Sequence, residues 1–442
     1  MAAGPSYAQI LRHDSMPAFV AAGALQFAGP STALVVLIFT IPTAYSSAGH
    51  AGQGAIALAL LGLASALPTF GAAFFSGPLA DRHDRHLLLR TSNLFSLVAT
   101  AGLAADLFVR PGGTVPIPGS SWFYLPVWVA FALPAWALLV SSATLFRPAY
   151  NASIPRLVPT TELGRANGMI YSTAALTGAV GALGVGVVLS VGSAVYALGF
   201  PFLLFLATQV ALVGVRADLS APRPRAQRRI LTDVAEGFRY LYRRRDIFEI
   251  TVAALVVNFL VAVAFVELGL YVLVWLRLAS GFWYGAMVSA STAGSAVGMV
   301  AVAHLKFEER AGRVLIALIL AIGVAIVALG LVRSIWLALP IVFVYGIFPG
   351  MVQTVFLSSV QATVPDEVLG RVFSADEVGS YALVPIGQVT GGAVTFEVGV
   401  QGTYLFAGGA IVALAVVMTG GFRALRTLGF TPRPAPGPPA TP

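Results

Sequence analysis

Few acidic residues lie inside the long apolar segments of this sequence, and those few are its best candidates for chemistry. Glu267 is the deepest of them, some twenty residues into its apolar segment and flanked by Val266 and Leu268. An ionised acid at the centre of a membrane helix costs roughly 2.5 to 3.5 kcal/mol on insertion scales, and such acids often carry protons or ions. The candidates for binding a proton are Glu267, Glu377 and Asp106.

Each of these acids also has a structural interpretation. Asp106 lies near the end of its segment with Arg110 four residues later, so an ion pair along the helix is expected. Glu377 lies in the first turns of a segment, where the helix dipole favours negative charge. The structural alternative for Glu267 is that it merely bonds a neighbouring helix or reaches the outer interface. Tyr271, one turn further on, shares its face and is expected to hydrogen-bond it.

Polar and aromatic residues within the apolar segments could line a central cavity. Asn258 and Glu267 are nine residues apart, which places them on opposite faces of a straight helix. Both can line one cavity only if the helix breaks, and Gly269 is the expected position. The alternative for every such residue is a hydrogen bond to a neighbouring helix. The cavity candidates are Gln26, Tyr171, Asn258, Tyr271, Tyr345, Gln353, Tyr381 and Gln388.

Two charged loops repeat one pattern in the two halves of the chain. Residues 81–85 read DRHDR and residues 309–313 read ERAGR, so each loop holds an acid, an Arg, two further residues and an Arg. Residues 158–165 (VPTTELGR) and 364–371 (VPDEVLGR) repeat a second string. Parallel repeats of helices describe a transporter whose substrate site lies between the halves, near the membrane midplane.

The first loop has the residues of a conformational latch. Gly77 lets two helix ends approach closely, and Asp81 can accept hydrogen bonds from the start of a neighbouring helix. Arg82 and Arg85 can hold carboxylates or anionic lipid headgroups. The alternative is that the arginines are ordinary positive charges of a cytoplasmic loop and the acid only caps a helix. The corresponding latch residues of the second half are Glu309, Arg310 and Arg313.

Twelve apolar segments must position these residues, and each is close to the ~20 residues that a helix needs to cross a membrane. An even number of crossings places both termini on one side. The segments are residues 17–41, 54–76, 87–108, 122–145, 166–189, 193–215, 247–276, 281–304, 314–332, 335–358, 372–396 and 402–422.

The basic residues orient this plan. With the N-terminus in the cytoplasm, 23 of the 26 Lys and Arg residues lie inside, and only Arg110, Arg277 and Arg333 lie outside. Cytoplasmic loops of membrane proteins carry such an excess. Both termini are therefore expected in the cytoplasm, with the chain in the inner or plasma membrane.

A long polar stretch divides the chain into two six-helix halves, residues 1–215 and 247–424. Residues 216–246 form the expected cytoplasmic linker. Ile230, Val234, Phe238 and Leu241 are at helical spacing there, which favours an amphipathic helix on the membrane surface; the alternative is a solvated linker. The proline-rich tail, residues 425–442, is expected to be disordered.

Composition excludes several classes of protein. The chain is 58% hydrophobic and only 10% charged, against about 25% charged residues in soluble domains. It contains no cysteine, and we find no cluster of metal ligands, no catalytic constellation and no GxxxxGK[ST] loop. No metal, cofactor or enzymatic activity is therefore expected, nor a role in an ATP-driven pump. The basic residues form short clusters between apolar segments, which argues against nucleic-acid binding.

Residues 77–85, GPLADRHDR, resemble the signature loop of the major facilitator superfamily, G-x-L-A-D-R-x-G-R. The sequence is further similar to the branch of siderophore and macrolide exporters. That similarity is carried by RPA at residues 147–149, LVPTTELGRANG at 157–168 and SSVQATVPDEVLGRVFS at 358–374. The resemblance implies an all-α membrane protein with twelve transmembrane helices in two six-helix repeats.

The resemblance also implies a mechanism. Asp81 would pair with the start of the eleventh helix near Arg371 when the transporter faces outward, and would release it when the transporter faces inward. Asp84 replaces the usual glycine, so a strained, left-handed turn is expected there. Gly29 and Pro30 stand where several drug exporters have an acid.

These observations together predict a monomeric secondary transporter that exports a small amphipathic molecule, drug-like or siderophore-like, by alternating access coupled to protons. Contacts with anionic lipids are expected as well. The alternative is an importer or facilitator of another small solute on the same fold.

Overall fold

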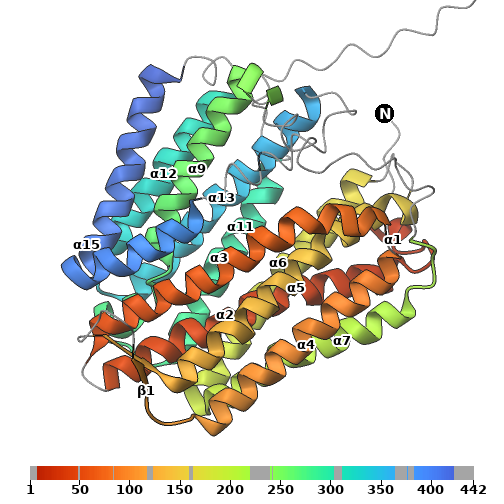
Figure 1. Cartoon of the computed structure of the whole chain (residues 1–442). Coiled ribbons are helices and arrows are strands. Elements are labelled where there is room, and N and C mark those ends of the chain that lie inside the picture. The colour runs from red at the N-terminus through yellow and green to blue at the C-terminus, as the bar shows by residue number, and fades with distance from the viewer. Residues whose placement is uncertain are drawn as a thin grey trace, which may run out of the picture.

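Long helices that run roughly parallel or antiparallel to one another make up almost all of the computed structural model (Figure 1). Within the described residues, nine helices are long and apolar enough to cross a membrane. The structure describes residues 7–47, 50–82, 84–116, 123–158, 163–219, 239–240, 242–302, 311–363, 376 and 383–422.

The first half of the chain contains a short helix and six long ones. Between α4 and α5, strands β1 (Thr114–Pro116) and β2 (Tyr124–Pro126) pair antiparallel, with Val115 opposite Leu125. The helices are α1 (Tyr7–Ile10), α2 (Met16–Ser47), α3 (Ala51–Arg82), α4 (Arg85–Val109), α5 (Val127–Leu157), α6 (Leu163–Val191) and α7 (Ala194–Gly214).

The second half is less regular than the first. A π-helix, η2, follows a break after α9, and α15 is interrupted at Gly399, whose φ of 74° is accessible to glycine at little cost. The elements are α9 (Arg245–Phe265), α10 (Leu268–Leu270), η2 (Tyr271–Trp275), α11 (Gly281–Val302), α12 (Ala311–Leu331), α13 (Ile335–Thr363) and α15 (Val384–Gly421).

Within the described residues, every predicted apolar segment overlaps a helix, although residues 372–375 and 377–382 of the eleventh lie outside them, and the all-α fold class is confirmed. The break at Gly399 separates the last two predicted segments within α15. The largest difference is at α5, which runs to Leu157 although the apolar segment was predicted to end at residue 145. The helix continues because Tyr150, Ile154 and Leu157 are buried in the core of the first half. The predicted surface helix of the linker lies mostly outside the described residues.

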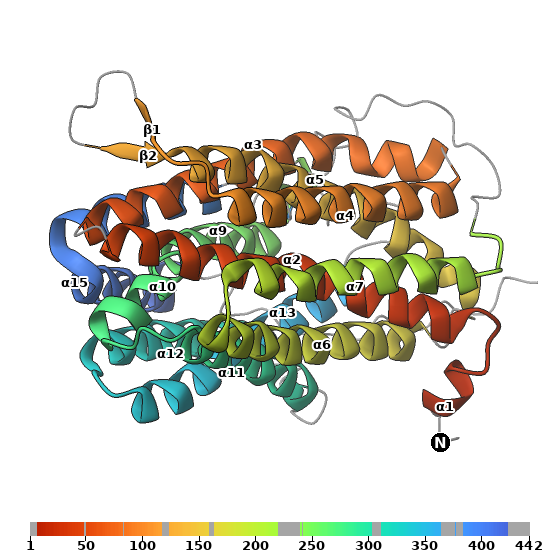
Figure 2. The same ribbon diagram turned by 90° about the horizontal axis from the view of Figure 1, so that it is seen from below.

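The two ends of the bundle differ (Figure 2). One end carries β1 and β2 and is called the hairpin end; there the Tyr45 hydroxyl, close to the end of α2, donates to the Tyr124 carbonyl oxygen at 2.9 Å. The other is called the linker end, because α7 ends and α9 begins there, and α1 also lies at that end.

The buried side chains form two cores, and those of the first half divide between these ends. One core contains residues of both halves, and its members from α2 and α3 lie between Ala33 and Leu61, on the hairpin-end side of those helices. The second core belongs to the first half alone and includes Ile10, Phe146 and Leu212, toward the linker end. The two halves therefore share apolar packing mainly toward the hairpin end.

Candidate functional site

Glycines of α6 and α11 bring the two halves together at the hairpin end. A Cβ atom added to Gly186 would lie 2.8 Å from the Gly281 carbonyl oxygen and 2.9 Å from Gly285 Cα. A Cβ atom added to Gly285 would lie 2.8 Å from Gly186 Cα. All three distances are too short for a real side chain, so the backbones of the two helices touch, as small residues allow between membrane helices.

A second contact joins α3 to α15. A Cβ atom added to Gly392 would lie 2.7 Å from the Ala55 carbonyl oxygen and 2.8 Å from Ala59 Cβ. Gln388, one turn earlier in α15, packs its side chain against Gly62. The cavity candidate Gln388 therefore lies in the contact between the halves at the hairpin end.

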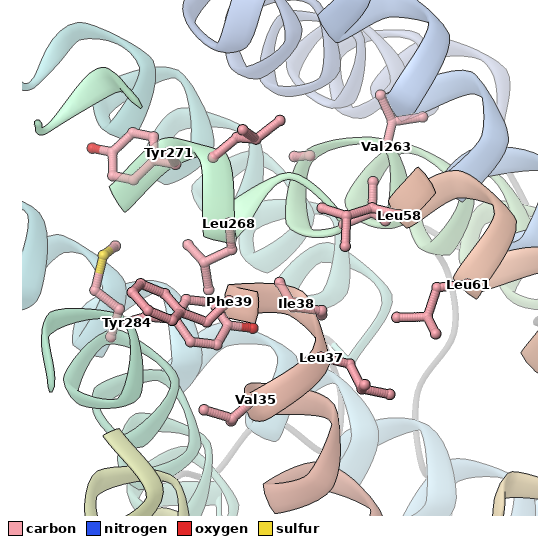
Figure 3. Packing of buried hydrophobic residues seen from close by; sticks show 14 of the residues in the cluster. Val35, Leu37, Ile38, Phe39, Leu58, Leu61, Val263, Leu268, Tyr271 and Tyr284 are labelled. Carbon is pink, nitrogen blue, oxygen red and sulfur yellow. The ribbon is translucent and has the colours of Figure 1, made fainter. Parts of the chain in front are cut away.

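A third contact involves α2, α10 and α11. Gly269 of α10 packs against the carbonyl oxygen of Ile38. The rings of Phe39 and Tyr284 stack with their centroids 6.3 Å apart, and Leu268 lies beside them (Figure 3). These three contacts close the hairpin end of the molecule.

Glu267 lies directly beside the third contact. The helix of α9 ends at Phe265, and Glu267 stands in the turn before α10. The break predicted for this segment is thus present, two residues before Gly269. The Glu267 side chain is 0% exposed, and neither carboxyl oxygen has a hydrogen-bond partner among the described residues. Unpaired buried polar groups are costly, and native structures keep few of them.

The predicted hydrogen bond from Tyr271 to Glu267 is wrong. The Tyr271 hydroxyl donates to the Leu329 carbonyl oxygen at 2.9 Å instead, because the turn at Glu267 and the wider π-turn rotate its ring toward α12. The hydroxyl of Tyr404, whose ring centroid is 4.8 Å from that of Tyr271, also lacks a partner among the described residues.

The other two acids are less deeply placed. The predicted ion pair of Asp106 and Arg110 is wrong, because Arg110 ends α4 in the left-handed conformation with φ 41°. Its guanidinium lies 5.7 Å from the Trp128 ring centroid instead. Asp106 is half-buried, and one of its oxygens has no partner among the described residues. Glu377 lies outside the described residues.

The signature loop lies at the linker end. Gly77, Asp81 and Arg82 are in the last turns of α3, and the side chains of Asp81 and Arg82 lie outside the described part. Arg85 is buried at the start of α4 and donates to the Leu219 carbonyl oxygen at 3.3 Å, which ties the loop to the beginning of the linker.

Asp84 corrects one expectation about that loop. Its φ is −58° rather than left-handed, and its carboxylate accepts a hydrogen bond from the His86 backbone N–H at 2.8 Å. Asp84 is thus the N-cap of α4, a position that aspartate favours, and no strained turn is needed. In the second half, Arg313 is exposed in the first turn of α12, whereas Glu309, Arg310 and Arg371 lie outside the described residues.

The remaining cavity candidates divide by burial. Gln26 is buried and donates to Ser96 Oγ of α4 at 3.2 Å, and Tyr345 is buried with its ring centroid 4.6 Å from that of Phe265. In this conformation, both side chains pack between helices and do not line a cavity, which is the alternative stated for these residues. Asn258 is half-buried, Gln353 and Tyr171 are exposed, and Tyr381 lies outside the described residues.

Sequence reasoning missed one group of residues around Tyr171. Arg147 was assigned to a loop but lies within α5, with its guanidinium 5.6 Å from the Phe27 ring centroid. The Tyr171 ring stacks on Phe27, and its hydroxyl donates to Asn151 of α5. A helical projection extended past residue 145 would have placed Arg147 and Asn151 on one face. Among the described residues, no three His, Cys, Asp or Glu side chains are placed to hold a metal ion.

Comparisons with known proteins agree with this architecture. The family described as Major Facilitator Superfamily matches residues 18–381. No curated protein matches the chain. A D-xylose–proton symporter structure is similar with a TM-score of 0.71 at 14% identity, covering 93% of this chain and 98% of that one.

Two further solved structures, each of a point mutant, are similar over comparable lengths. The nucleoside transporter NupG has a TM-score of 0.65 at 12% identity, covering 93% of this chain and 100% of its own. The peptide transporter POT has a TM-score of 0.68 at 12% identity, covering 94% of this chain and 95% of its own. At such identities the likeness shows the fold alone.

Proposed function

Because the chain belongs to the major facilitator superfamily, and is therefore a multi-pass membrane transporter and not an enzyme, we propose that it exports a small amphipathic molecule in exchange for protons. The observation that carries this proposal is the buried, unpartnered carboxyl group of Glu267 beside the contact that closes the hairpin end. A drug-like or siderophore-like substrate is suggested by the sequence resemblance.

The orientation follows from charge. The linker end holds the clustered basic residues, so we assign it to the cytoplasm together with both termini. The hairpin end then faces outward, and the structure is closed on that side. Alternating access requires a second conformation in which the three hairpin-end contacts separate.

Glu267 is placed to respond to that separation. Opening the hairpin end would part Gly269 from Ile38 and Tyr284 from Phe39, which lie on either side of the inter-half contact. An ionised carboxylate without a partner is costly in the closed surroundings, so closure of the hairpin end favours the protonated acid. Water entering from the hairpin end would load the proton from that side, and the exchange is complete when access from the linker end lets the proton leave to the cytoplasm as substrate binds.

A flux experiment in liposomes tests the proposal. The purified protein is reconstituted, and movement of siderophores, antibiotics and dyes is measured with and without a pH gradient. Accumulation driven by the gradient, in the direction opposite to proton flow, is expected. Transport in the same direction as protons would favour the importer, and gradient-independent equilibration would favour the facilitator.

The latch of the signature loop gives a separate prediction. We propose that Asp81 pairs with the start of the eleventh helix, near Arg371, when the linker end closes. Asp81→Asn should then leave insertion and substrate binding intact, reduce transport several-fold and bias the protein toward the inward-facing state. The chain lacks cysteine, so labelling of single introduced cysteines at the linker end measures this bias directly.

Asp84→Asn is the matched control, because it removes the same charge three residues away. Asparagine caps a helix as well as aspartate does, so α4 should be unaffected. Normal transport and unchanged labelling in Asp81→Asn would rule out the latch.

A further inference from the structure

Arg147 is an arginine inside a membrane helix, without an acidic partner among the described residues. It lies in α5 ten residues before the helix ends at Leu157, which is roughly 15 Å along the axis. Its side chain is exposed, and no acidic group in the described part of the chain forms an ion pair with it. The apolar span Val127–Asn151 contains this arginine, and charged residues within membrane spans usually face a water-filled space and mark a path for substrates or ions.

Aromatic and amide groups surround this arginine. Phe27 of α2 stacks on Tyr171 of α6, with centroids 6.3 Å apart and planes 7° apart. The Tyr171 hydroxyl donates to Asn151 Oδ1 at 3.3 Å, and Asn151 follows Arg147 by one turn on the same face of α5. Three helices thus bring Arg147, Phe27, Asn151 and Tyr171 together; they are called the arginine–aromatic cluster below.

The packing of α2 indicates which way the cluster faces. On one side of α2, the Phe205 ring of α7 packs against Gly29. The helices α3 and α6 flank α2 and each also contacts the second half, through α15 and α11. The side of α2 that carries Phe27 beside α5 and α6 therefore faces the second half rather than the outer surface of the bundle.

The free polar atoms of the cluster are mainly donors. The guanidinium of Arg147 presents a planar fork of N–H groups that matches a carboxylate. The Asn151 oxygen accepts from Tyr171, so its amide N–H₂ is directed to other acceptors. The Phe27 and Tyr171 rings add flat apolar surface beside these donors.

We propose that the arginine–aromatic cluster binds an organic anion, a small molecule with a carboxylate next to a ring or another flat apolar group. The carboxylate pairs with Arg147 and Asn151, and the apolar group stacks on Phe27. This inference rests on the proposed function only in taking the bound anion to be the cargo. A phosphate of an anionic lipid offers related chemistry, and the experiment separates the two.

The test uses the full-length protein in nanodiscs of phosphatidylcholine and paired probes, naphthalene-2-carboxylate and its uncharged carboxamide. Binding is measured by equilibrium dialysis and by thermal shift. The carboxylate should bind and the carboxamide should bind at least several-fold more weakly. Arg147→Gln should weaken carboxylate binding by roughly ten- to a hundredfold, the range for a hydrogen-bonded charge.

Matched variants keep the result interpretable. Arg156→Gln removes an exposed arginine of the same helix at the linker end and should leave binding unchanged. Asn151→Asp, nearly identical in shape, places a negative charge in the cluster and should abolish carboxylate binding. Arg147→Lys keeps the charge without the fork and should give an intermediate affinity, which covers the case that Arg147→Gln fails to fold.

Equal binding of the two probes, or unchanged carboxylate binding in both Arg147→Gln and Asn151→Asp, would overturn the proposal. So would a protein that binds neither probe but is stabilised by phosphatidylglycerol through Arg147, because the cluster would then be a lipid site. Equilibrium binding needs no gradient. If proton coupling fails, the binding result for the arginine–aromatic cluster therefore still stands. Gradient-driven flux without any preference for anions would contradict the anion-binding proposal and leave the proposed export function intact.

Discussion

Replacing Glu267 by Gln is expected to abolish proton-driven transport while exchange of substrate for substrate survives. The amide has nearly the shape of the protonated acid, so the closed hairpin end should form normally around it. It cannot release a proton, however, when the hairpin end opens. Gradient-driven flux in liposomes should fall at least tenfold, whereas exchange of labelled for unlabelled substrate at equal pH should stay within about twofold of the unchanged protein.

Glu397→Gln supplies the matched control for this prediction. Glu397 is exposed in α15 two residues before the break at Gly399, so it is an acid without the buried surroundings of Glu267. Its substitution should leave both kinds of transport unchanged. A Glu267→Gln protein that retains the pH dependence of the unchanged protein would exclude Glu267 as the coupling residue, whereas loss of exchange as well would indicate a structural role.

The position of Glu267 shows how far sequence reasoning reaches. Its depth and the need for a helix break were predictable, because apolar runs set depth and helical periodicity sets faces. The partner of Tyr271 was not predictable, since it depends on a π-turn that has no distinct sequence pattern here. Tyr404, although next to Tyr271 in space, is 133 residues away in the chain, and only tertiary packing brings them together.

Arg147, in contrast, was placed wrongly by the sequence. Apolar content predicted that its helix ends at residue 145, and the positive-inside pattern then explained the arginine as loop charge. The helix continues because one face, including Tyr150 and Ile154, packs into the first-half core, while the other face is polar. A criterion based on mean hydropathy misses the end of a membrane helix when that end is amphipathic. Here the polar face is directed toward the space between the two halves.

Gly186→Val is expected to prevent closure of the hairpin end and to reduce transport by tenfold or more. A side chain at Gly186 would meet the backbone of Gly281 and Gly285, which has no flexible end to move aside. Overpacking of this kind costs about 1 to 3 kcal/mol. Since it is felt only when α6 and α11 touch, it should shift the ratio of inward- to outward-facing protein by roughly 5- to 150-fold.

Labelling of a single cysteine at Leu189 reads out this shift, because the Leu189 side chain packs against Gly281 in the closed state. A membrane-impermeant maleimide added from the hairpin side should label Leu189→Cys faster when Gly186→Val is present. Gly178→Val, in the same helix, is the control: a Cβ atom there meets nothing within 4 Å, so labelling and transport should be unchanged. If both valine variants transport equally well, the contact of α6 with α11 is not the element that opens, and separation would have to occur at the other hairpin-end contacts, of α3 with α15 and of α2 with α10.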